Sequence, residues 1–382
     1  MTGTWPDLRS RMRGLVVGFC LGDAISRAPE PHTATLVAGT PSMLFLAGTE
    51  GVVRGLVQEQ ITGLSTGMAD ACWHATARWA FRSRQDTLAG VGERRRAAEP
   101  CAWPDGWLSQ LSLLRGGRGS APAIESALSL GSELDTRPGR TASDSVGDLV
   151  LARTLPVALL AALPSTPAPG AMPVSTADDT PDAPRGHPVS RVARDVAAYS
   201  HGLPAQVIAV AVTRTLAHVL QTGTVTGLVD LADLSALYQG VPHADDVVRA
   251  RVALRALADQ LPPHERTTAD ITHGVPSGPG SVLRATTEGL RCALTFPHRD
   301  QVPDAVEEVL TIPQPAAAAV TFALLGAAHG IEALPEDAVA RLDVGHVADQ
   351  LAGDLHTQVT VRPLAAGDGP AAQAWLERYP AS

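Results

Sequence analysis

The chain contains no lysine, so all 30 of its basic residues are arginines, and 39 acidic residues outnumber them. The formal net charge of −9 repels phosphate from the chain as a whole, so a nucleic-acid partner would need a local basic stripe. We therefore expect no nucleic-acid partner. Aromatic residues make up only 4% of the 382 residues and hydrophobic residues 45%, which predicts a core built mainly from Ala, Leu and Val.

Cysteine is also scarce. The four cysteines, Cys20, Cys72, Cys101 and Cys292, lie far apart, and no two of them form a C-x-x-C pair. This pattern argues against a disulfide framework and against a thiolate metal cage. It fits a reducing cytoplasm.

Long hydrophobic runs are missing as well. The longest apolar windows, Leu149–Leu163 and Ala316–Leu325, are shorter than the roughly 18 residues that suggest a membrane span. The N-terminal stretch MTGTWPDLRSRMRG lacks the charged segment and following apolar run of a signal peptide. We therefore expect no membrane partner and a cytoplasmic location.

Apolar residues recur at spacings of three and four along most of the chain, without a succession of alternating strands. The sequence therefore predicts an all-α, compact multi-helix fold in a single domain over residues 1–382. The predicted helices are Leu8–Leu21, Gly51–Leu64, Met68–Arg84, Ala121–Leu130, Val146–Leu163, Arg191–Tyr199, Pro204–Gln221, Leu228–Tyr238, Ala244–Gln260, Ser281–Phe296, Gln301–Leu310, Ala316–Gly330 and Val344–Leu355.

A proline-rich segment, Pro164–Pro188, interrupts this helical pattern. It has seven prolines and almost no large apolar side chain, so it cannot bury enough surface to offset its ordering entropy. Because the helical pattern resumes on both sides, we interpret it as a flexible insertion within the domain. A docking segment that orders on contact with a partner is the alternative.

Four segments resemble motifs of one protein family, in the family's order. They are Gly22-Asp23-Ala24 with Glu30 after it, Gly147-Asp148 leading to Arg153 and Pro156, Ser200-His201-Gly202-Leu203-Pro204, and Ala323–Gly330 followed by Leu334-Pro335. The family is that of the ADP-ribosylglycohydrolases, and the matches extend over residues 10 to 355. The resemblance implies a compact all-α fold whose pocket, in active relatives, holds two divalent ions and an ADP-ribose unit.

The metal-binding motifs of that family do not recur. Active relatives hold their ions with Thr-Asp-Asp-Thr at the start of an early helix and Asp-x-Asp-Thr at the start of a late one. Thr49-Glu50-Gly51-Val52 aligns with the early motif, and Pro313-Gln314-Pro315-Ala316 with the late one. Hard divalent cations need several oxygen ligands, so we predict no metal site and no cofactor.

The resemblance makes Glu30 the candidate catalytic acid or base, as a pocket carboxylate; an exposed loop residue is the alternative. Asp23 and Asp148 are candidate substrate-binding residues, and Asp23 could instead orient a neighbouring helix N-terminus. Arg153 lies in an apolar helix, where an unpaired charge is costly, so it needs Asp148, Asp23 or a bound anion as its partner. A salt bridge is the favoured interpretation.

Two further residues complete the candidate substrate-binding set. Arg118 lies in the turn Gly116-Gly117-Arg118-Gly119, where backbone N–H groups and a guanidinium could bind a diphosphate. His201 precedes Gly202 in a loop between helices, where a histidine that caps or hydrogen-bonds the backbone is the alternative to a ligand contact.

These observations favour a family member without a two-metal site that acts by binding. Its partner would be an ADP-ribose-like small molecule in the remnant pocket or a protein on the helical surface. The alternative is a hydrolase that cleaves a glycosidic bond without metal ions, with Glu30 as acid or base and Arg153 or Arg118 placing an anionic substrate. A third interpretation is a structural subunit of an assembly.

Overall fold

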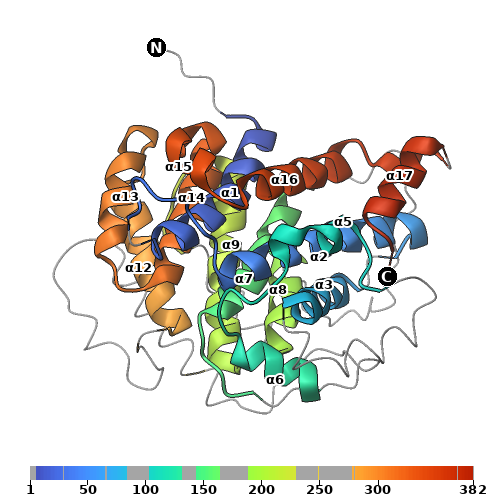
Figure 1. The fold of residues 1–382 in the computed structure, drawn as a ribbon, viewed down its shortest axis with the longest axis horizontal. Coiled ribbons are helices and arrows are strands. Elements are labelled where there is room, and N and C mark those ends of the chain that lie inside the picture. Colours follow the sequence, from blue (N-terminus) through green and yellow to red (C-terminus); the bar gives the residue numbers. More distant parts are fainter. Residues whose placement is uncertain are drawn as a thin grey trace.

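The computed structural model describes residues 6–28, 30–64, 67–83, 103–130, 143–163, 188–228, 248, 278, 280–367 and 369–381. Over these ranges the regular elements are helices, and the only β pairing is two isolated bridges, which confirms the all-α prediction. The α-helices, shown in Figure 1, are α1 (Leu8–Ile25), α2 (Thr40–Thr62), α3 (Met68–Ser83), α5 (Trp107–Gln110), α6 (Pro122–Leu130), α7 (Leu149–Thr154), α8 (Pro188–Ala198), α9 (Leu203–Thr222), α12 (Val282–Thr295), α13 (Val302–Thr311), α14 (Pro315–His329), α15 (Glu336–Arg341), α16 (Gly345–Thr360) and α17 (Pro370–Arg378).

Most of the predicted helices are present with bounds that differ by a few residues. Two predicted helices, Leu228–Tyr238 and Ala244–Gln260, and the segment Pro164–Pro188 lie outside the described residues, apart from a single residue in each. The short helices α5, α15 and α17 were not predicted.

The largest difference concerns α2, which begins at Thr40 and not at Gly51. Every residue from Thr40 to Val57 is buried, so the first half of the helix has no polar face to mark its period. The predicted helix, Gly51–Leu64, therefore covers only the later part of α2, where Gln58 and the residues after it reach the surface.

The predicted helix Val146–Leu163 is divided in two. The α-helix α7 ends at Thr154, and a 3-10 helix continues over Leu155–Ala162. Pro156 explains the change, because its ring removes a backbone donor and clashes with the preceding turn of an α-helix.

Helices α1 and α14 pack closely because glycine removes the side chains between them. A Cβ on Gly18 would lie 2.2 Å from the carbonyl oxygen of Phe322, and one on Gly22 would lie 2.3 Å from that of Ala318. The pairing order shows that the two helices are antiparallel. The C-terminal end of α1 therefore lies beside the N-terminal end of α14, which positions the candidate site.

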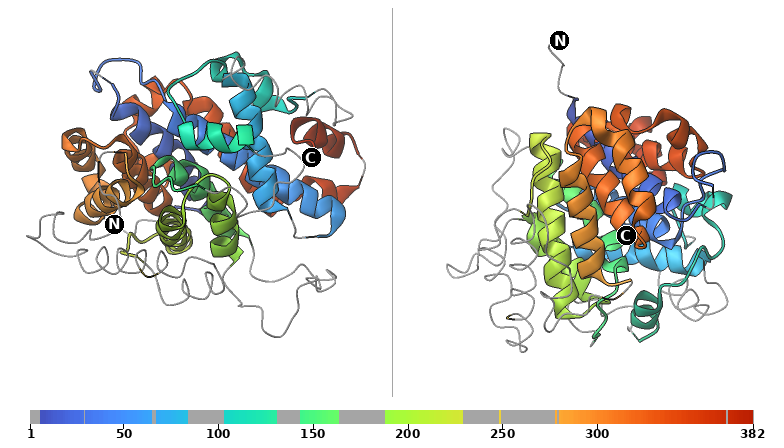
Figure 2. Two further views of the ribbon diagram at one scale, coloured as in Figure 1. Left: turned by 90° about the horizontal axis from the view of Figure 1, so that it is seen from below. Right: turned by 90° about the vertical axis from the view of Figure 1, so that its left-hand side faces the viewer.

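Helix α9 packs beside α8, α12 and α14 (Figure 2), and most of its residues are buried. By length and composition it is the one helix among the described residues that could cross a membrane. However, 72% of its apolar stretch is buried inside the protein, and the core helix of a soluble protein meets the same criteria.

Candidate functional site

The carboxylate of Asp23 joins the end of α1 to the start of α2. Asp23 is buried, and its Oδ2 accepts hydrogen bonds from the Gly39 N–H at 2.8 Å, the Ser42 N–H at 3.2 Å and the Ser42 hydroxyl at 2.6 Å. The first N–H groups of a helix have no partner within the helix, and its positive dipole end favours a carboxylate. Asp23 therefore orients the N-terminus of α2.

Arg27 neutralises the charge of Asp23. Its Nε donates to Oδ1 of Asp23 at 2.7 Å, and the side chain of Arg27 is 40% exposed, whereas that of Asp23 is 1% exposed. The guanidinium lies against Gly39, where a Cβ would be 2.6 Å from Nε. Each oxygen of Asp23 thus accepts from at least one donor. The donor to Oδ1 is the cation Arg27, which reaches towards solvent.

Asp148 and Gln314 link the starts of α7 and α14. The Gln314 amide donates to Oδ2 of Asp148 at 2.9 Å, and its carbonyl oxygen accepts from the Gly280 N–H at 3.0 Å. Burial raises the pKa of Asp148 to about 6, opposed by the positive charge of Arg27. Asp148 therefore lies within electrostatic reach of Arg27. We call Asp23, Arg27, Asp148 and Gln314 the helix-end site.

The environment of Arg153 differs from the prediction. Its Nη1 donates to the hydroxyl of Ser200, and its guanidinium lies 4.9 Å from the centre of the Trp73 ring. Its Nε and Nη2 have no hydrogen-bond partner in the described part of the chain, and burial lowers its pKa to about 10. The predicted salt bridge to Asp148 or Asp23 is therefore wrong, because those carboxylates bond to Gln314 and Arg27.

His201 shares the hydroxyl of Ser200 with Arg153. Its Nδ1 lies 2.8 Å from Oγ of Ser200, and the ring is buried. Burial, together with the charge of Arg153, lowers the pKa of His201 to about 3, so the ring is neutral at physiological pH. The loop is fixed by the Gly202 N–H, which donates to the carbonyl oxygen of Ser145 at 2.9 Å.

Arg118 ties together three loops. Its Nη1 donates to the carbonyl oxygen of Ala38 at 2.9 Å and to the carboxylate of Asp343, and its Nη2 donates to the carbonyl oxygen of Leu113 at 2.8 Å. Both terminal nitrogens therefore already have acceptors within the protein.

Glu30 lies exposed in the loop between α1 and α2. Its carboxylate accepts from the hydroxyl of Thr33 at 3.1 Å. Arg341 fixes this loop, because its Nη1 donates to the carbonyl oxygens of Pro31 at 3.0 Å and Ala34 at 2.6 Å. The hydrogen bond of Glu30 thus stays within its own loop.

The structure therefore brings two of the predicted residues into the helix-end site and places two others together at Ser200. Sequence reasoning missed Arg27, and it placed Gln314 at the variable position of the late family motif without assigning it a role. Arg27 could have been found, because it follows Asp23 by four residues, the spacing at which opposite charges meet on a helix.

The helix-end site does not fit a pair of divalent ions. Helix α2 begins with Thr40-Pro41-Ser42, and α14 begins with Pro315-Ala316, so neither first turn supplies a carboxylate. Both oxygens of Asp23 already accept from protein donors. Across the described ranges, no three His, Cys, Asp or Glu side chains gather as a metal site.

The alignment of the early motif with Thr49–Val52 is wrong. These residues lie inside α2, nine or more positions after its start at Thr40, so they cannot form a helix-start motif. Glu50 is buried and accepts from Nη2 of Arg54 at 3.0 Å. The first turn of α2, Thr40-Pro41-Ser42, has the position that the family motif requires.

The comparison with family models agrees with the resemblance. The family model "ADP-ribosylglycohydrolase" matches residues 4–364. A solved structure named "ADP-ribosylglycohydrolase-related protein complex" is 16% identical, with 92% of this chain and 99% of that chain covered and a TM-score of 0.45. No curated protein matches the chain.

Proposed function

Because the chain belongs to the ADP-ribosylglycohydrolase family, we propose that it is a family member that binds a ligand without two-metal hydrolysis. The observation that supports this proposal is the ion pair of Arg27 with Asp23 beside two helix starts that carry no carboxylate. The guanidinium supplies the positive charge that the buried carboxylate needs. Ions are therefore not required to neutralise the site.

The proposed ligand is an ADP-ribose-like small molecule. Its diphosphate would bind to Arg27, the partly exposed cation of the helix-end site, because guanidinium groups bind phosphate oxygens with paired donors. Arg153 is 1% exposed, so its proposed role is to hold Ser200 and His201 in place. Arg118 would contribute only if it released Asp343.

Thermal unfolding with ADP-ribose, ADP and AMP tests this proposal. Ligand at a hundredfold excess over its Kd stabilises the native state by about 2.7 kcal/mol, which gives a measurable rise in Tm. Arg27→Met should remove the rise. Arg13→Met is the control, because Arg13 is similarly exposed and pairs with Asp349 at 2.5 Å.

An unchanged Tm at millimolar concentrations of all three nucleotides would contradict the nucleotide proposal. A protein partner on the helical surface would then be favoured. Elemental analysis after loading with magnesium or manganese adds a separate test. Two stoichiometric ions would refute the absence of a metal site.

Metal-independent hydrolysis is the second candidate function. Asp148 favours it, because burial raises its pKa to about 6, in the range of a general acid or base that works near neutral pH. Glu30 is the other candidate. Release of ADP-ribose from modified arginine or serine, measured for Asp148→Asn and Glu30→Gln, would show which carboxylate acts. Absence of turnover in the unmodified protein would exclude this candidate for those substrates.

We further propose a cytoplasmic location. Cys20, Cys72 and Cys292 are free and buried, and burial raises the pKa of each thiol, as expected for unreactive structural cysteines.

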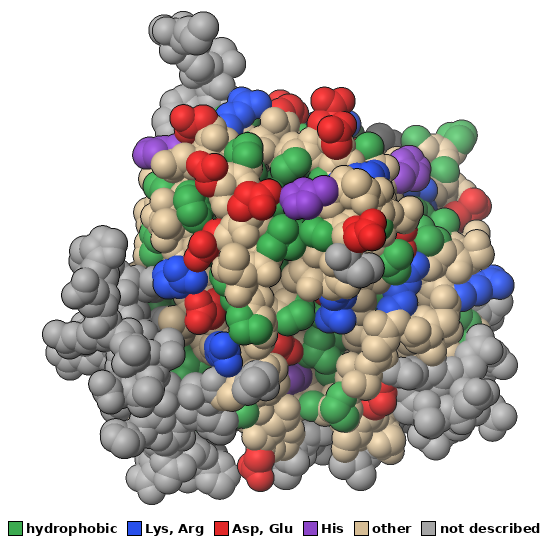
Figure 3. All heavy atoms as spheres, turned by 60° about the vertical axis from the view of Figure 1, so that its left-hand side comes forward, with side chains coloured by type: hydrophobic (Ala, Val, Ile, Leu, Met, Phe, Trp, Pro, Cys, Tyr) green, Lys and Arg blue, Asp and Glu red, His purple; other side chains and the backbone are tan. Residues whose placement is uncertain are grey.

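On the face shown in Figure 3, acidic and basic side chains are interspersed, without a single block of basic charge. This mixed face supports the proposal that nucleic acid is not the partner.

A further inference from the structure

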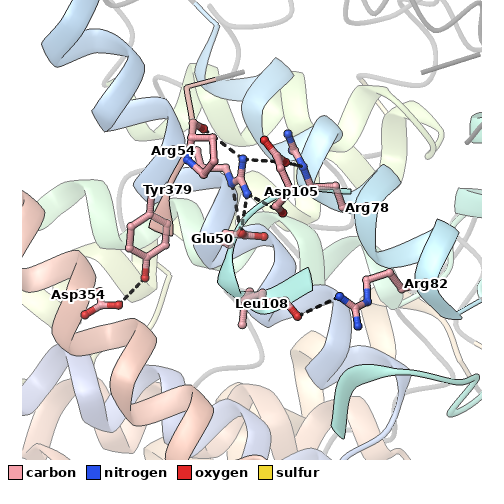
Figure 4. A network of polar contacts seen from close by, with 9 residues as sticks. Glu50, Arg54, Arg78, Arg82, Asp105, Leu108, Asp354 and Tyr379 are labelled. Atoms are coloured by element: carbon pink, nitrogen blue, oxygen red, sulfur yellow. Dashed lines mark hydrogen bonds and ion pairs between the residues drawn. The ribbon is translucent and has the colours of Figure 1, made fainter. Parts of the chain in front are cut away.

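A second buried polar cluster lies between α2, α3 and α5, apart from the helix-end site (Figure 4). Arg54 lies between two carboxylates: its Nη2 contacts Oε1 of Glu50 at 3.0 Å, and its Nη1 contacts Oδ1 of Asp105 at 3.2 Å. Nε of Arg78 donates to the same oxygen of Asp105 at 2.5 Å. With Arg82, these residues form what we call the arginine cluster.

The arginine cluster has more positive than negative charge. Arg82 donates to backbone carbonyl oxygens of the segment after α3, so three guanidinium groups accompany two carboxylates. Burial and the charge of Arg54 lower the pKa of Arg78, while burial and the charge of Arg115 lower that of Arg82. A buried cation without a counter-charge is costly, so this cluster favours an added anion.

A hollow with a cavity volume of about 30 Å³, which opens to solvent, borders the cluster. Two of its lining residues have buried donors without a hydrogen-bond partner among the residues described: Nη1 and Nη2 of Arg78, and Nε1 of Trp79. Arg78 is 1% exposed and Trp79 is 8% exposed. Glu50, whose carboxylate is bound by Arg54, and Arg82 and Ser109 also line the hollow. The remaining wall is apolar and includes Met43, Leu46, Leu108 and Leu114.

We propose that this hollow binds a small molecule that carries a carboxylate on an apolar body. The two free nitrogens of Arg78 form a fork that matches two carboxylate oxygens, and the indole N–H of Trp79 adds a third donor. The anion supplies the missing negative charge, and the apolar wall packs against the body of the ligand. This site goes beyond the proposed function, which concerns the helix-end site.

The test uses the full chain and sodium isovalerate, with sodium phosphate and sodium chloride at equal ionic strength. Isovalerate should raise the Tm in a saturable manner and more than phosphate, which lacks an apolar body. Trp79→Phe keeps the ring and removes one donor, so the affinity should fall about tenfold. Arg78→Met should remove the saturable rise.

Trp375→Phe is the matched control. The Trp375 indole N–H donates to Oε1 of Gln358 at 2.8 Å, away from the hollow, so this variant should bind isovalerate as the unmodified protein does. In NMR spectra of protein with isotope-labelled tryptophan, the indole N–H signal of Trp79 is assigned by its loss in Trp79→Phe. This signal should shift on titration with isovalerate. The signal of Trp375 should not.

Three results would overturn the proposal: no saturable rise in Tm with isovalerate, an equal rise in Arg78→Met, or a moving Trp375 signal with a fixed Trp79 signal. An equal rise in Tm with phosphate and with isovalerate would contradict the proposal that the ligand carries an apolar body. Because Trp79→Phe retains the packing of the ring, it keeps the test decisive if Arg78→Met does not fold.

Discussion

The helix-end site and the arginine cluster both involve α2, but they differ in how their polar atoms are satisfied. Asp23 has donors for both oxygens and a cation beside it. Arg78 has one partner, Asp105, and two nitrogens without any among the described residues. A buried polar group that lacks partners destabilises the fold unless something binds to it. The carboxylate of Asp23 therefore joins helices and leaves only the exposed part of Arg27 for a ligand, whereas Arg78 offers buried donors that have no partner among the described residues.

The two regions also depend on different helix contacts. The helix-end site depends on the α1–α14 contact at Gly18 and Gly22. The arginine cluster depends on the α2–α3 contact, where a Cβ on Gly51 would lie 2.5 Å from Cα of Cys72. Variants can therefore disturb one region and spare the other.

Gly18→Ala should give the largest effect. Its Cβ would lie 2.2 Å from the Phe322 carbonyl oxygen, and a backbone atom cannot move aside alone, so we expect a loss of about 3 kcal/mol or more in the free energy of unfolding. Urea unfolding measures the loss. Isovalerate binding at the arginine cluster should persist wherever the variant is folded.

Gly353→Ala in α16 is the control for that variant. Nothing lies within 4 Å of the added Cβ, so the change should stabilise the protein by about 1 kcal/mol through helix propensity. A similar effect of both variants would contradict the close α1–α14 contact.

Asp23→Ala should give the next largest effect. It leaves the start of α2 without its acceptor and Arg27 without its partner, so we expect a loss of about 2–4 kcal/mol. Asp349→Ala removes a surface ion pair with Arg13 and should cost about 0–1 kcal/mol in the same unfolding assay. Equal losses would show that Asp23 contributes no more to the free energy of unfolding than a surface ion pair does.

The predictable part of the fold is the set of helices with one polar face. α12 and α13 lie within one residue of their predicted bounds because their sequences alternate between core and surface. The first half of α2 could not be predicted in this way because it is buried on every side. Whether a helix is buried on one side or on every side depends on tertiary packing. A helix that is buried on every side shows no alternation of polar and apolar residues in the sequence.

The candidate site was predictable to the extent that its contacts are local. A helix-orienting role for Asp23 follows from its place at the end of α1, and the Asp23–Arg27 spacing is visible in the chain. The contact of Arg153 with Trp73 joins α7 to α3, and the partner of a buried arginine cannot be derived from one helix alone. The same holds for Arg78 and Asp105, which are 27 positions apart.

Asp148→Asn tests the helix-end site through the pH dependence of stability, a dependence that we do not expect from the arginine cluster. Burial raises the pKa of Asp148 to about 6 from an ordinary 3.8, so the folded state holds the proton more tightly than the unfolded state. Its stabilising contribution is complete below pH 3.8, falls as the pH rises, and is lost above about pH 6. Relative to Asp148→Asn, the unmodified protein should lose about 2–3 kcal/mol across that window.

Urea unfolding at a series of pH values measures this difference. His201 acts in the opposite direction, because burial lowers its pKa to about 3, so its contribution is complete above its ordinary pKa of 6.5 and is lost as the pH falls. Both proteins retain His201, and the difference between them isolates Asp148. Parallel pH profiles would show that Asp148 titrates normally.

Arg153→Met should give the smallest effect and separates two kinds of buried arginine. Arg153 and Arg54 are each 1% exposed, but Arg153 has a hydroxyl and an aromatic ring as partners, whereas Arg54 has two carboxylates. Methionine fills much of the volume and leaves no charge unpaired, so Arg153→Met should cost about 1 kcal/mol. Arg54→Met leaves Glu50 without its cation and should cost about 3–5 kcal/mol in the same assay. If Arg153→Met costs as much, Arg153 has a charged partner in solution in addition to Ser200 and Trp73.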